Sequence, residues 1–161
     1  TLLYLAAEKG DTSQVKLLLD KVDHPDQRDN CKWTPLMRAA QNGHLDVTKL
    51  LLMSGADVNA IDKGGYSVLM VAASRHNPAI ITLLIHHGAD LNLQDPALGW
   101  TALIWAAKEG HDENVKILLH AGSDVSIMDA TGKSAMDWAR ENNHPVFSNN
   151  PLYHGSSEPG S

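Results

Sequence analysis

The chain has 161 residues, of which 43% are hydrophobic and 20% are charged, a composition that allows one continuous core to form. Its single cysteine, Cys31, excludes an intramolecular disulfide, and no apolar run approaches the roughly 18 residues that a membrane span needs. The net charge of −6 argues against nucleic-acid binding, which depends on clustered Lys and Arg, and favours a basic or apolar protein partner.

The chain starts with a predicted inner helix over residues 1–7, TLLYLAA, which is followed by a predicted outer helix over residues 13–19. Asp11 or Thr12 is suited to begin the outer helix, because short polar side chains cap the free N–H groups of a helix start. Pro25 forbids a helix in the segment that comes next. We therefore expect a helix pair that leads into a loop.

The second unit runs over residues 33–59 and reads WTPLMRAAQNGHLDVTKLLLMSGADVN. Thr34 and Pro35 suit the start of a short helix, and Gly43 tolerates the positive φ that breaks it. A second helix follows and ends at Gly55. The two helices present the apolar positions Leu36, Ala39, Ala40, Val47, Leu50, Leu51 and Leu52. Such a helical hairpin is too small to bury its own apolar faces, so it needs neighbours of the same kind.

The third and fourth units repeat this pattern with small departures. Val68 replaces the proline, and Asn77 and Pro78 are suited to cap and begin the next outer helix. The fourth unit carries one extra residue in the loop over residues 93–99, where Pro96 shapes a longer tip. We expect this insertion to alter the binding edge and to leave the core unchanged.

The fifth unit departs most, because the sequence HPVFSNNP stands where an apolar outer helix would be expected. Pro145 and Pro151 deny it more than about one helical turn. A missing helix exposes apolar surface of the fourth unit, and Phe147, Leu152 and Tyr153 are the candidates to fold back over it. Beyond them, the end of the chain reads as a flexible linker or as a remnant of expression cloning.

A Thr or Ser opens each unit at positions 1, 34, 67, 101 and 134, so successive units are 33, 33, 34 and 33 residues apart. The period and the motifs TPLMRAA, NGH, EGH, LLMSGADVN, LLIHHGADLN and LLHAGSDVS closely resemble the ankyrin repeat family. The resemblance implies an all-α ankyrin-repeat solenoid of stacked helix-turn-helix units with projecting β-hairpin loops. It implies about four full repeats plus a truncated fifth, with a repeat domain over residues 1–143 and a tail over 144–161.

Candidate chemistry is sparse. His44 and His111 occupy the same position after Gly, where the family has a structural histidine that ties adjacent turns by hydrogen bonds. His86, His87 and His120 fall at helix ends, where a cation complements the helix dipole without any metal. Cys31 has neither a base nor an orienting acid at a recognisable spacing, and no phosphate loop or nucleophile elbow occurs. We predict no catalytic residue, no metal site and no cofactor.

A concave wall of hairpin tips and inner helices is the expected functional surface. Large side chains recur there at the position just before the opening Thr or Ser and at the fourth position after it. Trp, Tyr and Arg are the residues enriched at binding hot spots. We predict that the partner-binding residues are Trp33, Arg38, Tyr66, Trp100, Trp105 and Trp138, with the last three rings partly exposed. In the alternative interpretation, one or two of these rings only pack on neighbouring loops.

Trp100, Trp105 and Trp138 also permit a more specific hypothesis. Trp105 and Trp138 could flank a gap that Trp100 closes, and three such faces attract an alkylated ammonium. This arrangement resembles the methyl-lysine cage in the ankyrin domain of the euchromatic histone methyltransferases. That cage has an acidic residue where this chain has Lys108, so Glu109, Asp137 or Glu141 would have to substitute.

Two further motifs lie outside this wall. The sequence NPLY at residues 150–153 matches a turn recognised by phosphotyrosine-binding-type domains. Asn59 and Asn92 occupy a loop position that resembles the substrate of the asparaginyl hydroxylase of hypoxia signalling, so they are candidate modification sites. A loop-capping role is the alternative for both asparagines.

The sequence thus predicts a non-catalytic interaction module that binds a peptide or protein segment in its concave groove. The alternatives are a methyl-lysine or histone-tail reader and a substrate-recruiting domain of a larger enzyme. We expect a monomer in the cytoplasm or nucleus that binds neither nucleic acid nor a membrane.

Overall fold

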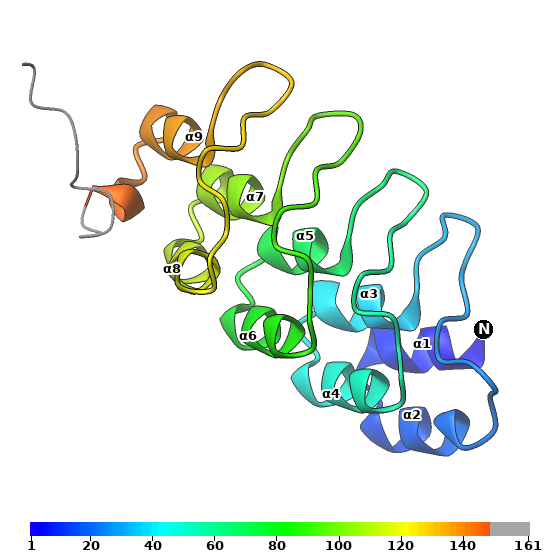
Figure 1. The fold of residues 1–161 in the computed structure, drawn as a ribbon. Helices are drawn as coiled ribbons and strands as arrows, with labels where there is room; N and C mark the ends of the chain where they lie inside the picture. The colour runs from blue at the N-terminus through cyan, green and yellow to red at the C-terminus, as the bar shows by residue number, and fades with distance from the viewer. Residues whose placement is uncertain (149–161) are drawn as a thin grey trace, which may run out of the picture.

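The computed structural model describes residues 1–148, and within that range the secondary structure is helical, with no strand. The helices form antiparallel pairs that stack one after another along the chain (Figure 1). An inner helix opens each unit, and these helices are α1 (Leu2–Lys9), α3 (Pro35–Gln41), α5 (Val68–Ala73), α7 (Ala102–Glu109) and α9 (Ala135–Glu141). The outer helices are α2 (Thr12–Leu19), α4 (Leu45–Met53), α6 (Pro78–His86) and α8 (Asp112–His120).

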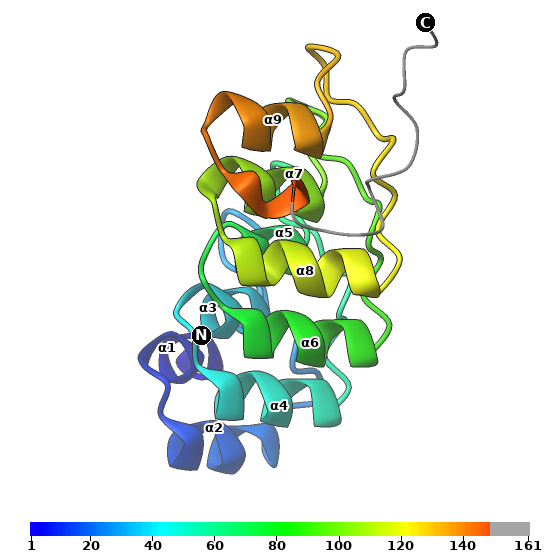
Figure 2. The ribbon, with the colours of Figure 1, turned by 90° about the vertical axis from the view of Figure 1, so that its left-hand side faces the viewer.

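The inner helices form one layer and the outer helices a second. Each inner helix packs on the next from α1 to α9, and each outer helix packs on the next from α2 to α8. The two layers are seen in Figure 2, where α2, α4, α6 and α8 lie in front. Long loops between the units project to one side of the stack (Figure 1). Their only regular pairing among residues 1–148 is an antiparallel bridge between Ile61 and Ser67. The predicted solenoid is therefore confirmed.

Every inner helix begins as the repeated Thr or Ser predicts. The side-chain oxygen of each accepts the N–H of the residue three positions later, as Thr34 does from Met37 at 3.2 Å. Asn77 differs from expectation, because its side chain does not cap α6 and instead donates to the carbonyl of Ala40 at 2.9 Å. The amide is thereby used to tie neighbouring units together.

The predicted structural role of the two histidines is confirmed. His44 Nε2 lies 2.9 Å from the carbonyl oxygen of Glu8, and His111 Nε2 lies 3.2 Å from that of Ser74. The His44 ring is pressed against Gly10, where a Cβ atom would lie 2.6 Å from it, at a φ of 73°. A side chain at this glycine would be excluded both by the ring and by the backbone conformation.

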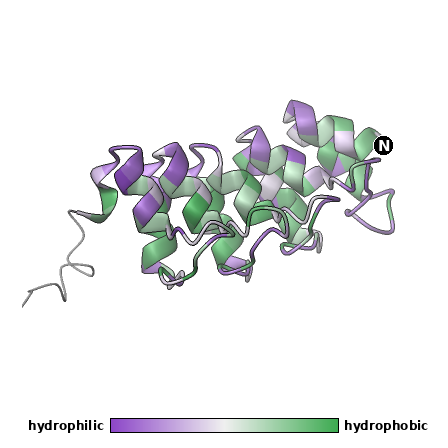
Figure 3. Ribbon diagram, turned by 90° about the horizontal axis from the view of Figure 1, so that it is seen from above, coloured by the Kyte–Doolittle hydropathy of each residue, from purple (hydrophilic) through white to green (hydrophobic). Residues whose placement is uncertain are grey.

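The core is continuous from the first unit to the last. Its largest fully buried side chains come from both layers, and hydrophobic residues run along the whole stack (Figure 3). The apolar positions predicted for the second unit include Leu36 and Leu51, which are fully buried. Leu50 is only partly buried and packs at the margin of the core.

The fifth unit has a 3₁₀ helix, η1 (Pro145–Phe147), in place of an outer helix. Val146 and Phe147 are buried there, and η1 packs against α8 and α9. The prediction that Phe147 folds back over the fourth unit is confirmed, and packing continues past residue 143. Leu152, Tyr153 and the NPLY motif lie outside the described residues. Among the described helices, none is long and apolar enough to cross a membrane.

Candidate functional site

A row of aspartates fixes the tips of the projecting loops. Asp62 is typical: its Oδ1 accepts the backbone N–H groups of Gly64 at 2.8 Å and of Tyr66 at 2.9 Å. The row consists of Asp29, Asp62, Asp95 and Asp129. These aspartates were not among the residues predicted from the sequence, although their recurrence 33, 33 and 34 residues apart was the available signal. Each aspartate holds the backbone of the residue that precedes the opening Thr or Ser.

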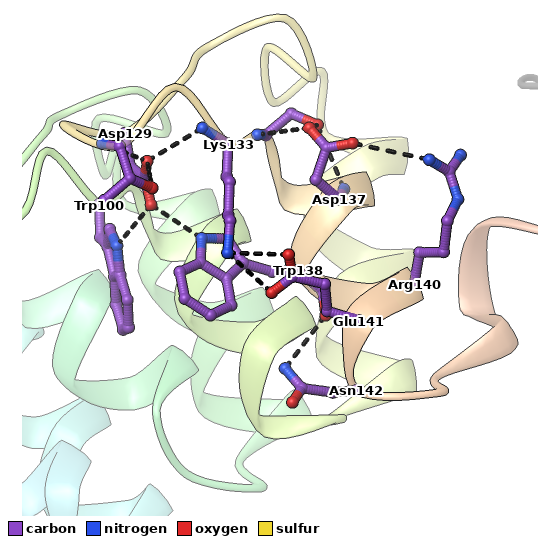
Figure 4. Close-up of polar contacts among 10 residues, drawn as sticks. Trp100, Asp129, Lys133, Asp137, Trp138, Arg140, Glu141 and Asn142 are labelled. Carbon is purple, nitrogen blue, oxygen red and sulfur yellow. Dashed lines mark hydrogen bonds and ion pairs between the residues drawn. The ribbon is translucent and has the colours of Figure 1, made fainter.

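At the C-terminal end of the wall, Asp129 joins two tryptophans into what we call the closed cluster, which consists of Trp100, Asp129, Lys133 and Trp138 (Figure 4). Asp129 Oδ2 accepts the indole N–H of Trp100 at 3.0 Å and that of Trp138 at 2.8 Å. The Lys133 ammonium lies 4.5 Å from the Trp138 ring centroid and pairs with Glu141 at 2.8 Å. Every polar group of these four side chains is thus bonded within the chain.

The closed cluster corrects the prediction of a cage. Trp100 was expected to be partly exposed, but only 7% of it is accessible. Its ring stands edge-on to Trp105 at a centroid distance of 4.6 Å and to Trp138 at 5.4 Å. Trp100 therefore fills the gap that Trp105 and Trp138 were expected to flank. Lys108, whose ammonium lies 5.4 Å from the Trp100 ring centroid, already occupies the place of a cation.

Asp129 is held ionised by its surroundings. Burial by itself would raise the pKa of its carboxyl group, but hydrogen bonds from Thr131, from the Lys133 N–H and from the Trp138 indole outweigh burial. The result is a pKa far below the ordinary value for aspartate. The carboxylate thus stabilises the packing of both tryptophans at neutral pH.

At the other end of the wall, Arg38 lies between two aromatic rings. Its guanidinium carbon is 4.5 Å from the Trp33 ring centroid and 5.2 Å from that of Tyr4, and its Nε donates to the Tyr4 hydroxyl. Glu8 at 3.8 Å and Asp29 at 4.0 Å balance its charge. Arg38 is therefore engaged by its own chain from several sides.

Between these ends, the wall contains a hollow of about 170 Å³. We call it the open hollow, and it is lined by Trp33, Gln41, Tyr66, Met70, Val71, Ser74 and Trp105. Its walls are aromatic: the Tyr66 and Trp105 rings meet edge-on at a centroid distance of 6.0 Å. Three of the six predicted binding residues, Trp33, Tyr66 and Trp105, thus meet here, whereas Trp100 and Trp138 belong to the closed cluster.

The open hollow exists because Val71 is small. In the second and fourth units, the fourth residue after the opening Thr or Ser packs on an aromatic ring: Arg38 on Trp33, and Trp105 on Trp100. The third unit has Val71 at this position, and its short side chain cannot cover the neighbouring rings of Trp33 and Tyr66. The hollow is therefore the space that a larger side chain fills elsewhere along the wall.

The indole N–H groups of three tryptophans are anchored by aspartates, and that of the fourth is not. Trp33 donates to Asp62 at 3.0 Å, and Trp100 and Trp138 donate to Asp129. The indole nitrogen of Trp105 is buried without a hydrogen-bond partner in the described part of the chain. Trp105 is thus packed on the wall without the polar anchor that fixes the other three.

Asn59 and Asn92 both connect neighbouring loops. The side-chain oxygen of Asn59 accepts the N–H of Asp90 at 2.8 Å, and that of Asn92 accepts the N–H of Asp124 at 2.9 Å. Asn59 also donates to the carbonyl of Gly88 at 3.2 Å. These bonds correspond to the loop-capping interpretation, and modification of either residue remains a prediction.

Residues 1–148 contain no group of three or more His, Cys, Asp or Glu side chains arranged to hold a metal ion. Cys31 is free and exposed on its loop. The wall itself presents aromatic faces, a hollow and fixed loop tips.

Two family models match the chain. A model described as ankyrin repeats in three copies matches residues 1–62 and 69–148, and a model described as ankyrin repeats in many copies matches residues 43–85. A comparison with curated proteins found no match.

Proposed function

The chain belongs to the ankyrin-repeat family, and from this premise we propose that it is a non-catalytic module that binds a protein segment along its concave wall. Ankyrin repeats are generally protein–protein interaction modules. We propose that the open hollow anchors the segment by accepting one of its side chains. The observation that carries this proposal is the meeting of Trp33, Tyr66 and Trp105 around a space that residues 1–148 leave unfilled.

The size and lining of the hollow support an anchoring role. Its volume of about 170 Å³ is far larger than the roughly 10 to 15 Å³ that a single water molecule needs, so the hollow has room for a side-chain group. Release of water from aromatic and aliphatic walls favours such an insertion. Partly exposed Trp and Tyr side chains around a pocket are also typical of binding hot spots.

The rest of the wall gives the segment a fixed surface to lie on. The aspartate row orders the loop tips before any partner arrives, so little conformational entropy is lost on binding. The proposed form is a monomer. The proposed setting is the cytoplasm or nucleus, where an exposed free thiol such as Cys31 stays reduced.

Selection of peptides from a random displayed library against the 161-residue chain tests the proposal. We expect Trp105→Ala and the space-filling Val71→Trp to weaken binding of the selected peptides by about 2 kcal/mol, roughly thirtyfold. Ile61→Ala and Met128→Ala are matched controls, because both side chains are exposed on the projecting loops away from the hollow. Binding that survives both wall variants and is lost in the loop variants would refute the proposal.

A further inference from the structure

The chain covers most of its own aromatic faces with cations. Arg38 lies over Trp33, Lys108 over Trp100 and Lys133 over Trp138, at 4.5, 5.4 and 4.5 Å from the respective ring centroids. Tyr66 and Trp105 have no such cation among residues 1–148. These two rings without a cation both line the open hollow. The same attraction that places a cation over the other rings is therefore available there to a ligand.

Two carboxylates act on residues that line the hollow. Asp62 accepts the indole N–H of Trp33, and Asp95 is almost completely buried next to the third loop tip. Neither carboxylate has an ion-pair partner in the described part of the chain. Burial raises the pKa of the Tyr66 hydroxyl, and the charges of Asp95 and Asp62 raise it further. The hollow is thus in a negative field.

Arg38, which contacts the lining residues Trp33 and Gln41, does not cancel these charges. Its charge is balanced by Glu8 and Asp29, and Arg38 does not line the hollow. Asp62 and Asp95, which have no ion-pair partner among residues 1–148, therefore remain as negative charges that act on Tyr66.

The rim of the hollow offers hydrogen-bond acceptors. Ser74 donates its hydroxyl hydrogen to the carbonyl of Val71 at 2.8 Å, which leaves the oxygen lone pairs free. Gln41 Oε1 accepts one bond, from Arg38 at 3.1 Å, and can accept a second. The Tyr66 hydroxyl has no hydrogen bond within residues 1–148. A guanidinium group, planar and with five donors, can stack on the rings and reach several of these acceptors.

We propose that the open hollow binds an arginine side chain of the partner segment, with its aliphatic stem on Val71 and Met70 and its guanidinium against Tyr66 and Trp105. This inference rests on the proposed function and specifies the chemistry of the partner: a segment with arginine at the anchoring position. The negative field and these two rings without a cation together select a cation over an aliphatic group.

The test uses the ¹⁵N-labelled 161-residue chain and four capped amino acid amides: arginine, its uncharged isostere citrulline, leucine and trimethyllysine. We expect arginine amide to shift the indole N–H signals of Trp33 and Trp105 saturably, with about tenfold tighter binding than citrulline amide. Val71→Arg should abolish the shifts, because it places a cation where Arg38 lies in the second unit. Leu5→Arg, at the same repeat position but away from the hollow, should preserve them.

Each other outcome overturns the inference. Equal or tighter binding of citrulline or leucine amide would make the hollow an apolar pocket, and a preference for trimethyllysine amide would assign it to alkylated lysine. The absence of any saturable shift up to about 50 mM would exclude an arginine site. In all three cases the proposal of a concave binding surface is tested separately, by comparing how the library-selected peptides bind the parent chain and the Val71→Trp variant.

Discussion

The closed cluster and the open hollow both have aromatic residues at the position before the opening Thr or Ser and at the fourth position after it, yet they differ in what surrounds the rings. Trp100 is covered by Trp105 and Trp138 and bonded to Asp129, so its contacts are complete without a partner. Trp33 has the corresponding bond to Asp62. One unit later, however, the position that Trp138 holds relative to Trp100 is occupied by Val71, which is too small to cover the Trp33 ring. Whether an aromatic side chain on this wall is structural or available for binding therefore depends on the size of the residue at the fourth position of the next unit.

Removal of Trp100 should have the largest effect on stability. Trp100→Ala deletes a buried ring that contacts two others and leaves Asp129 short of a donor, so we expect a loss of about 3 to 5 kcal/mol in the free energy of unfolding. A urea titration of the parent chain and the variant measures this loss in the free energy of unfolding. A loss below about 1 kcal/mol would mean that the closed cluster does not stabilise the stack.

Removal of Trp105, unlike removal of Trp100, should affect partner binding more than stability. Trp105→Ala should weaken binding of library-selected peptides by about 2 kcal/mol and destabilise the fold less than Trp100→Ala does. The stability loss is smaller because the Trp105 ring is partly exposed and its indole N–H has no hydrogen bond to lose within residues 1–148. If Trp100→Ala and Trp105→Ala lose the same stability and bind the selected peptides equally well, the closed cluster and the open hollow do not differ in the way described.

Asp129 should make the closed cluster sensitive to acid. Asp129→Asn keeps the size of the side chain but removes the charge and one acceptor, so we expect a loss of about 1 to 3 kcal/mol at pH 7. The pKa of Asp129 is lower in the folded state than in the unfolded chain, so the unfolded state binds the proton more readily. Its contribution is present in full above about pH 5 and is lost as the pH falls below the unfolded value, about 3.9.

Thermal melts of the parent chain and Asp129→Asn between pH 7 and pH 2 measure this dependence. The difference between the two melting temperatures should narrow as the pH falls below about 4. A difference that stays constant over this range would show that the ionised form of Asp129 is not the stabilising one.

The smallest effect is expected at Lys133, which lies over the Trp138 ring at the surface. Lys133→Ala removes a partly exposed cation–π contact and an ion pair to Glu141, worth together about 1 kcal/mol or less. High salt should reduce the difference from the parent. A loss larger than that of Asp129→Asn would place the main stabilising interaction of the cluster on the lysine.

The repeat architecture could be predicted because each element has a local cause in the sequence. Thr34 caps its helix and Gly43 adopts the positive φ that ends it, and both roles follow from residue type and spacing. The resemblance to the ankyrin family implied that His44 ties two turns. The separate roles of Trp33 and Trp100 could not be predicted in this way. They share a repeat position, and their difference depends on packing with Val71 and Trp138, about 38 residues later in the chain.

The chain contains four tryptophans, so its indole N–H signals report on both regions in one spectrum. The most direct test is a titration of the ¹⁵N-labelled chain with a library-selected peptide, with signals assigned by single Trp→Phe variants. We predict that the signals of Trp33 and Trp105 shift and saturate, while those of Trp100 and Trp138, both bonded to Asp129, stay in place. Shifts confined to Trp100 and Trp138 would contradict the account, because the partner would then bind where the structure is closed.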